Sequence, residues 1–456
     1  MSKIQKDLTT GSVFKKMVLF ALPFLATNII QSLYNAADIF IVGNFSGPAS
    51  MSGVSIGGQI TMTLTFLVMG FTTGATVLIG QYMGANNNDG IKKTTATIIT
   101  LLLFCGAGIA AVILIFKNPI LRLIQTPPES YPESAAYLTV TAVGIVFIFG
   151  YNALSAILRG MGNSKQPFYF VSISCVTNIV LDLVFVAGFH LGAFGAAVAT
   201  VISQALSVIL CIRYLIRNKF QFDFKPSSFR LYKAELGLII KIGLPSCIQS
   251  GFTSLSLLFV TTLINVVGGV SGSAGAASAN QFGNFAFIPL MAISVAISTM
   301  TAQNIGAGKM DRAIRSCRIG TTFAAVLTWA FFVLAWVFPS HIISIFGDDP
   351  AVIQDGVSYL RAFSFSFLLL PIISCINGFF IGAGHTVIAM VTSILYSVLL
   401  RVPLSYLFGV YFGWGLFGVG LGSPGGHLGG LLIIAVYLIS GKWKNVSIKA
   451  KASVEA

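Results

Sequence analysis

The stretch QYMGANNND, residues 81–89, returns in altered form as QNIGAGKMD at residues 303–311. The glutamine, one glycine, the following alanine and the aspartate match at a constant offset of 222 residues. The same offset pairs further residues: Pro23 with Pro245, Tyr137 with Tyr359, Gly160 with Gly382, and Gly162 with Gly384. GAFG at 192–195 matches GLFG at 415–418 with an offset of 223, as one inserted residue would give. A register kept over most of both halves indicates an internal duplication.

Both halves are strongly apolar. Of 456 residues, 55% are hydrophobic and only 9% are charged, with a mean hydropathy of +0.89; soluble domains carry about 25% charged residues. Apolar stretches of about 20 residues, the length that crosses a ~30 Å hydrocarbon layer, recur along the chain. We therefore predict an all-α polytopic membrane protein with twelve transmembrane helices. These spans are placed at residues 17–43, 52–83, 94–116, 135–158, 167–188, 192–216, 237–266, 275–304, 313–338, 352–381, 386–409 and 414–440.

Each half holds an even number of spans, so both halves enter the membrane from the same side. This pattern predicts two parallel six-helix repeats, related by a pseudo-twofold axis along the membrane normal, around a central cleft. The predicted N-lobe covers 1–216, the cytoplasmic connecting loop 217–236, and the C-lobe with its basic tail 237–456. Such duplicated halves are more often transporters than channels or enzymes, although that inference is an analogy between folds.

The net charge of +14 follows the topology. Lysine and arginine gather in the segments on one side of the predicted membrane, which predicts that both termini lie in the cytoplasm. We expect a multi-pass protein of the cell (plasma or inner) membrane. The basic residues are thus expected to contact anionic membrane lipid, and no nucleic acid partner is expected. The first apolar run, from Met17, continues well past the length of a signal peptide.

The sequence shows no motif of a catalytic, redox or metal-binding site. The six cysteines lie singly, without metal-ligand or redox spacing. Neither a nucleotide-binding P-loop nor a nucleophilic triad occurs, which disfavours ATP-driven export and gives no reason to expect an enzyme or a cofactor.

Four motifs together resemble the MATE (multidrug and toxic compound extrusion) family over essentially the whole chain. They are the GLP-like openings of spans 1 and 7, DIFIVG at 38–43, GQYMGA at 80–85 and ILRGMGNSK at 157–165. The resemblance implies a secondary-active multidrug efflux antiporter that confers antibiotic resistance. It would export cationic small-molecule drugs in exchange for inward Na⁺ or H⁺ by alternating access. We expect a monomer.

Two of the thirteen acidic residues, Asp38 and Asp182, lie well inside predicted spans. An acid at the centre of a membrane helix costs roughly 2.5–3.5 kcal/mol on insertion scales, so it is expected to have a function. Asp38 precedes Asn44 by six residues and Asp182 precedes His190 by eight. At about 1.5 Å per residue, both acids lie roughly 9–12 Å below the outer surface and can meet in one pocket.

Polar side chains share helix faces with the acids: Gln31 and Tyr34 with Asp38, and Asn178 with Asp182. Thr200 on span 6 offers a hydroxyl and Asn152 on span 4 an amide. Carboxylate, amide and hydroxyl oxygens suit a hard cation such as Na⁺. A carboxyl group shielded from water can equally load a proton.

The resemblance implies the same site. Archaeal, DinF-like and MepA-like members bind the coupling cation in the N-lobe through a span 1 aspartate, a span 5 Asn-x-x-x-Asp pair and a span 6 threonine. The matching residues here are Asp38, Asn178, Asp182 and Thr200. Gln31 and Tyr34 match polar positions of the cavity, to which we add Asn152 as a substrate-cavity candidate. NorM-like members place acids in spans 7 and 10; span 7 here has none and span 10 only Asp355.

Several questions stay open at this point. In the alternative to a cation-binding role, the two acids form hydrogen bonds that fix the register of the packed helices. Arg401 in span 11 makes a cationic substrate site in the C-lobe less attractive, and its role is either to open that lobe to water or to pair with carbonyl groups. Span 12 is rich in glycine and interrupted by Pro424 and His427. Alternative functions are a lipid-linked precursor flippase, which Arg401 and Arg361 favour, and an ion channel. The sequence does not name the drugs or the coupling ion.

Overall fold

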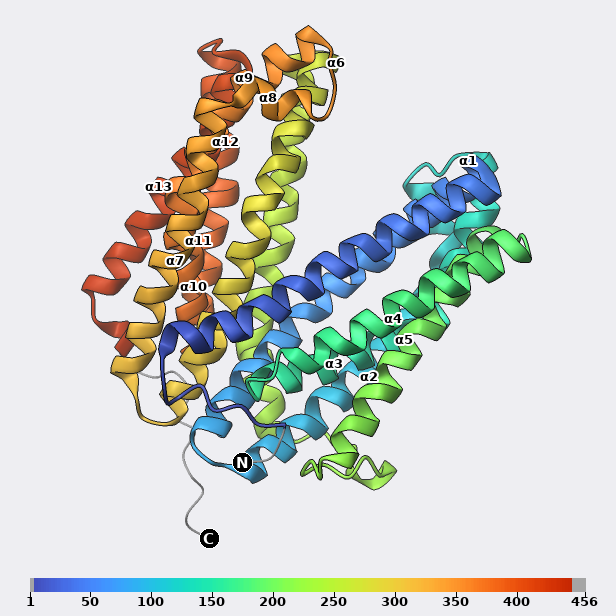
Figure 1. The fold of residues 1–456 in the computed structure, drawn as a ribbon, viewed down its shortest axis with the longest axis vertical. Coiled ribbons are helices and arrows are strands. Elements are labelled where there is room, and N and C mark those ends of the chain that lie inside the picture. The colour runs from blue at the N-terminus through green and yellow to red at the C-terminus, as the bar shows by residue number, and fades with distance from the viewer. Residues whose placement is uncertain (1–3, 445–456) are drawn as a thin grey trace. The chain divides into compact units, whose positions relative to one another are not determined.

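The computed structural model describes residues 4–444, and within that range all regular elements are helical (Figure 1). The first half contains α1 (Val13–Gly84), α2 (Asn88–Leu123), α3 (Tyr131–Gly160), α4 (Lys165–Asp182), the π-helix η2 (Leu183–Gly188) and α5 (Gly192–Arg217). The second half contains α6 (Lys233–Gly306), α7 (Met310–Val337), α8 (Pro339–Ser344), α9 (Pro350–Ser364), α10 (Ser366–Gly382), α11 (Thr386–Ile394), the π-helix η4 (Leu395–Leu400), α12 (Arg401–Tyr406), the π-helix η5 (Leu407–Tyr411) and α13 (Gly415–Ile439). Short 3₁₀ turns occur at Pro128–Ser130, Pro226–Ser228 and Lys442–Lys444.

The two longest helices each consist of two spans. Helices α1 and α6 contain 72 and 74 residues, and each is broken at one glycine, Gly47 (φ 82°) and Gly269 (φ 56°). Positive φ is costly for residues with a Cβ atom, so glycine is suited to these corners. Gly47 and Gly269 are themselves 222 residues apart, so the repeat places a corner after the first span of each half.

The number of spans agrees with the prediction. Among residues 4–444, nine helices are long and apolar enough to cross a membrane, and the pair α9–α10, bent by 43°, adds a tenth span. Counting α1 and α6 as two spans each gives the twelve transmembrane helices expected from the sequence. The fold class is an all-α polytopic membrane protein.

The chain divides into two compact units. The first comprises 1–7 and 22–243, and the second 8–21 and 244–456. The main division thus falls near the predicted end of the connecting loop, but the segment 8–21 packs with the second unit. Leu8 N–H donates to Gln303 Oε1 at 3.1 Å, and Phe14 packs edge-to-face on Phe323 with ring centroids 5.2 Å apart.

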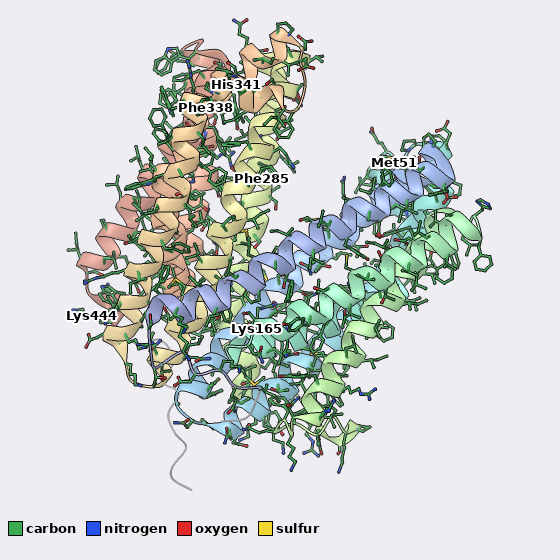
Figure 2. The ribbon with its side chains drawn as sticks, viewed as in Figure 1. Met51, Lys165, Phe285, Phe338, His341 and Lys444 are labelled. Carbon is green, nitrogen blue, oxygen red and sulfur yellow. The ribbon has the colours of Figure 1, made fainter. Side chains whose placement is uncertain are left out.

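In the first unit, α3 packs against both α2 and α5, and α4 packs against α5. Met51 and Lys165 mark opposite ends of this unit in Figure 2. Between them lies a buried apolar cluster of residues Ile41, Val42, Val54, Tyr137, Val186, Ala193, Ala196 and Ala197. We call these residues the apolar cap, because they cover the site described below.

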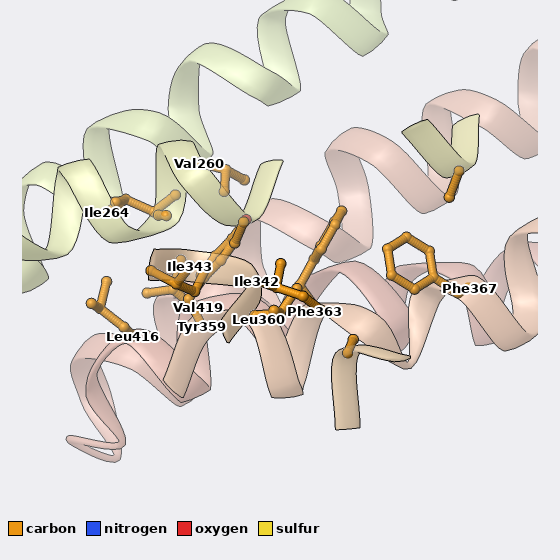
Figure 3. Packing of buried hydrophobic residues seen from close by; sticks show 14 residues of the cluster. Val260, Ile264, Ile342, Ile343, Tyr359, Leu360, Phe363, Phe367, Leu416 and Val419 are labelled. Carbon is orange, nitrogen blue, oxygen red and sulfur yellow. The ribbon is translucent and has the colours of Figure 1, made fainter. Parts of the chain in front are cut away.

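The core of the second unit is made by α6, α7, α8, α9, α10 and α13 (Figure 3). Val260, Tyr359, Phe363 and Val419 lie together there and are at most 4% exposed. Tyr359 stacks on Phe363 with ring centroids 5.7 Å apart. Val260 is the repeat partner of Asp38. A packed aliphatic side chain therefore stands in the second unit where the first has a carboxyl group.

The inserted residue of the second half coincides with a π-helical turn. The offset is 222 up to Gly384 and 223 from Gly415. Between these positions lies η4 (Leu395–Leu400), whereas the equivalent part of the first half is regular α4. A π-turn accommodates one extra residue within a helix and is frequent at functional sites. Arg401 follows this turn directly.

The first helix turn of α5 gives one testable contribution to stability. Glu133 Oε2 accepts the backbone N–H of Ala193 at 2.8 Å, at the N-terminus of α5. A carboxylate bonded there interacts favourably with the helix dipole as well. We expect Glu133→Ala to lower the free energy of unfolding by about 1–2 kcal/mol, measured as a lower melting temperature in detergent. Glu129→Ala, which removes an exposed carboxylate of the same segment, is the control; an equal loss there would contradict this assignment.

Candidate cation site

The two intramembrane acids of the first unit meet across one amide. Asp38 on α1 is 4% exposed, and Asn178 and Asp182 on α4 are fully buried. With its amide nitrogen turned toward the acids, Asn178 donates to Asp38 Oδ1 at 2.8 Å and to Asp182 Oδ2 at 3.1 Å. The carboxyl groups of Asp38 and Asp182 also interact directly. The i, i+4 spacing on α4 is what places Asn178 and Asp182 on the same face.

Two hydroxyl groups complete the cluster. Tyr34 donates its hydroxyl hydrogen to Thr200 Oγ1 at 2.9 Å, and Thr200 in turn interacts with the Asp38 carboxyl. Tyr34 lies one turn before Asp38 on α1, whereas Thr200 comes from α5, so three helices contribute to one site. We call Tyr34, Asp38, Asn178, Asp182 and Thr200 the acid cluster.

Sequence reasoning missed one member of this environment. Tyr137 on α3 is 6% exposed, and its hydroxyl lies within reach of Thr200 and near both acids. Its pairing with Tyr359 in the repeat was a usable signal, because a matched buried tyrosine in both halves indicates a shared position in each lobe. Gly57 permits this packing, since a Cβ atom there would lie 2.4 Å from the Tyr137 ring.

Two predicted cavity residues are not brought to the acid cluster. The amide of Asn152 donates to the carbonyl of Ile148 on its own helix at 2.8 Å. Gln31 is exposed on α1, two helical turns before Asp38. Neither side chain contacts the carboxyl groups in this structure, so their assignment to a substrate cavity stays a prediction.

The apolar cap closes the acid cluster toward the Met51 end of the unit. Ile41 and Val42 follow Asp38 by one helical turn, Val186 follows Asp182, and Ala196 and Ala197 precede Thr200. All five side chains are buried. A cation arriving from that end therefore has to cross roughly one turn of apolar packing, about 5 Å, before it reaches the carboxyl groups.

The acid cluster has no basic partner. Among residues 4–444, no lysine or arginine forms an ion pair with Asp38 or Asp182; the Lys93–Asp89 and Lys225–Asp223 pairs lie outside the acid cluster. Asp182 Oδ1 is buried without a hydrogen-bond partner. Two neighbouring carboxylates in a medium of low dielectric repel each other, and a proton or a metal cation removes that repulsion. The arrangement can therefore bind and release a small cation.

Comparison with known proteins identifies the family. A family model described as MatE matches residues 23–184 and 245–407, which is most of the chain and spans both halves. The chain belongs to the MatE family. The two matched segments begin at Pro23 and Pro245, the prolines that the repeat pairs.

Relatives of known name cover nearly the whole chain. "Probable multidrug resistance protein YoeA" of Bacillus subtilis is 30% identical over 93% of this chain and 93% of its own length. "Probable multidrug resistance protein YpnP" of the same organism is 28% identical over 97% of this chain and 98% of its own length. "Multidrug export protein MepA" of Staphylococcus aureus is 24% identical over 88% of both chains.

Solved structures support the fold. The crystal structure of a MATE protein in the bent conformation superposes with a TM-score of 0.89 at 23% identity, over 95% of this chain and 97% of that one. An outward-facing multidrug resistance MATE transporter gives a TM-score of 0.87 at 23% identity, over 96% and 98%. This MatE-family chain is thus a multi-pass membrane protein with the transporter fold.

Proposed function

We propose that this protein is a secondary-active multidrug exporter of the cell membrane, which exchanges inward Na⁺ or H⁺ for outward organic cations by alternating access. The observation that carries the proposal is the acid cluster: two buried carboxyl groups, without a basic partner, held by one amide and two hydroxyls. The names of the relatives supply the substrate class. We further propose that the protein acts as a monomer with both termini in the cytoplasm.

Exchange follows from competition for buried negative charge. While one monovalent coupling cation occupies Asp38 and Asp182, it compensates one of the two negative charges at this site. Release of the cation leaves two carboxylates in a medium of low dielectric, and a cationic drug then compensates that charge. The carboxyl groups cannot satisfy both cations at once, so the inward cation displaces the outward one.

The experiment compares driving gradients in the wild-type protein. Proteoliposomes loaded with a fluorescent cationic drug receive a Na⁺ gradient, a pH gradient of equal size, or neither. We expect saturable efflux with one gradient and background leakage without any. Efflux that is unchanged by both gradients would overturn the exchange mechanism, and conductance without drug would favour the channel alternative.

The orientation of the Asn178 amide distinguishes coupling by H⁺ from coupling by Na⁺. A proton leaves the amide nitrogen donating to the acids, the orientation that the hydrogen-bonding pattern assigns to Asn178, whereas Na⁺ requires the amide oxygen to turn toward it as a ligand. Asn178→Leu removes both the amide nitrogen and the amide oxygen. If Na⁺ couples, we expect the Na⁺ concentration for half-maximal efflux to rise at least about tenfold, since one lost polar contact to an ion is worth about 1.5–3 kcal/mol.

If H⁺ couples, the same variant should bind its coupling ion more tightly, whereas with Na⁺ it should bind the ion more weakly. Carboxylates that have lost two donors hold a proton more tightly, so half-maximal efflux moves to higher pH. Asn44→Leu is the control, because that exposed amide donates to the Phe40 carbonyl of its own helix. An Asn178→Leu profile that matches Asn44→Leu for both ions would remove Asn178 from the coupling site.

The flippase alternative is less well supported. A carrier of lipid pyrophosphate needs a basic cavity, and the acid cluster has the opposite charge. The relatives described above are named for multidrug resistance and export.

A further inference from the structure

The second unit contains a half-buried arginine, Arg401, that has no acidic partner among the described residues. Arg401 begins α12, directly after the π-turn η4, in the interior of span 11. The ion pairs among the described residues do not include it, and its Nε–H is buried without a hydrogen-bond partner. Asp355 is the nearest acid by sequence within the spans of this unit, and its carboxylate already accepts the Ser271 hydroxyl at 2.7 Å.

The side chains around Arg401 include two tyrosines and one histidine. Its guanidinium lies within hydrogen-bonding reach of the Tyr359 hydroxyl and close enough to Tyr396 and His427 to interact with them electrostatically. The rings of Tyr396 and His427 are 5.1 Å apart. His427 is 7% exposed, and its Nδ1 has no partner. We call Arg401, Tyr359, Tyr396 and His427 the arginine cluster.

The glycines of α13 bring these groups together. A Cβ atom on Gly426 would lie 2.3 Å from the Tyr396 carbonyl oxygen, and one on Gly422 would lie 2.7 Å from the Arg401 carbonyl oxygen. Only glycine therefore lets α13, which carries His427, approach η4 and α12 so closely. The π-turn widens the neighbouring helix at the same place. The glycine-rich span, unexplained in the sequence, thus serves the geometry of the arginine cluster.

The repeat shows that the two units have opposite polarity at this position. Tyr359 is the partner of Tyr137, which lies beside the acid cluster. With the offset of 223, Arg401 corresponds to Asn178. Val260 occupies the place of Asp38 and is packed in the core. The first unit therefore offers carboxylates beside its shared tyrosine, and the second offers a guanidinium.

An unpaired guanidinium in a membrane interior is costly, and a bound counter-ion removes that cost. We propose that the arginine cluster is a binding site for a monovalent anion, either chloride or a carboxylate group. Arg401 supplies the charge and the planar donor fork. The Tyr396 hydroxyl and the unpartnered His427 Nδ1, when protonated, supply the remaining donors. The Tyr359 hydroxyl donates to Asn280 Oδ1 at 3.5 Å, and its oxygen helps to position the guanidinium.

The test measures anion binding by the purified full-length protein in detergent, without transport. Sodium methanesulfonate, whose anion carries no carboxylate group, is replaced by sodium chloride or by sodium acetate at constant Na⁺ and ionic strength. We expect one or both small anions to raise the melting temperature of the wild type by about 3 °C or more. Arg401→Gln should abolish the rise. Arg361→Gln should keep it, since that arginine is exposed over Trp336 at 5.9 Å.

The comparison of chloride with acetate identifies the kind of anion that binds. Stabilisation by chloride alone assigns an inorganic anion, and stabilisation by acetate assigns a carboxylate-bearing ligand; both outcomes support the site. Saturable binding of radiolabelled chloride or acetate to the wild type gives the same answer if Arg401→Gln does not fold. Absence of both bindings, or a thermal shift that persists in a folded Arg401→Gln protein, overturns the proposal. These readouts do not depend on the coupling ion, so they stand apart from the proposed exchange.

Discussion

Asp38→Asn is expected to abolish gradient-driven drug efflux while leaving the protein folded. The carboxyl group is 4% exposed and is joined through Asn178 to Asp182. Asparagine has nearly the same shape but no negative charge, so the coupling cation loses half of its charged ligands. A tenfold ion gradient stores about 1.4 kcal/mol and sustains at most about a tenfold drug gradient in one-for-one exchange. We expect the steady-state drug gradient to fall from that value to about one.

Thermal stability distinguishes a cation-binding role of Asp38 from a purely structural role. If Asp38 only held helices in register, the asparagine variant would lose a bond and melt at a lower temperature. A charge-binding role predicts the reverse, because removal of one of two neighbouring carboxylates relieves their repulsion. The measurement is drug efflux beside thermal unfolding in the same preparation. Full efflux, or lost efflux with a melting temperature several degrees lower, would contradict the assignment.

Asp182→Asn tests whether the two acids act as one unit. Because a single cation is held by both, either single variant should cost about as much efflux as the double variant, as is usual for residues that act together. Asp355→Asn is the matched control, since that carboxylate accepts a serine hydroxyl in the second unit. Additive losses in the double variant would indicate two separate ion sites.

The large features of the fold could be predicted because they depend on patterns that any sequence displays. Apolar length gives the spans, and the constant offset of 222 residues gives the duplication. The acids could be paired for the same reason: a carboxyl group is rare in hydrocarbon, and the depth along a helix is fixed by its rise. Asp38 and Asp182 do meet, with Asn178 between them.

The contributions that the sequence did not reveal depend on helix rotation and on local geometry. Whether span 4 turns Asn152 or Tyr137 toward the acids depends on how α3 packs against α2 and α5; the structure selects Tyr137. Likewise, one inserted residue can be absorbed in a loop or in a helix. It coincides with the π-turn before Arg401, which apolar periodicity cannot show.

Gly426→Ala is expected to destabilise the second unit strongly for a change of one methyl group. Its Cβ atom would lie 2.3 Å from the Tyr396 carbonyl oxygen and 3.2 Å from Arg401 Cβ. A backbone oxygen cannot rotate away as a side chain does, so α13 has to move from η4. Overpacking of this kind costs about 1–3 kcal/mol or more. We expect a melting temperature lower by several degrees, and weaker anion binding at the arginine cluster, in the detergent-purified protein.

Two other glycines of the second unit make this prediction specific. Gly425→Ala on the same helix would meet only the Leu404 Cδ1 atom at 2.8 Å, and Gly251→Ala on α6 would meet no atom within 4 Å. Both replacements should preserve the melting temperature, because a leucine methyl can rotate aside and open space takes a methyl group without strain. If all three variants melted alike, the glycines of α13 would serve flexibility and not close approach. The distance between α13 and η4 would then have to be set by other side chains.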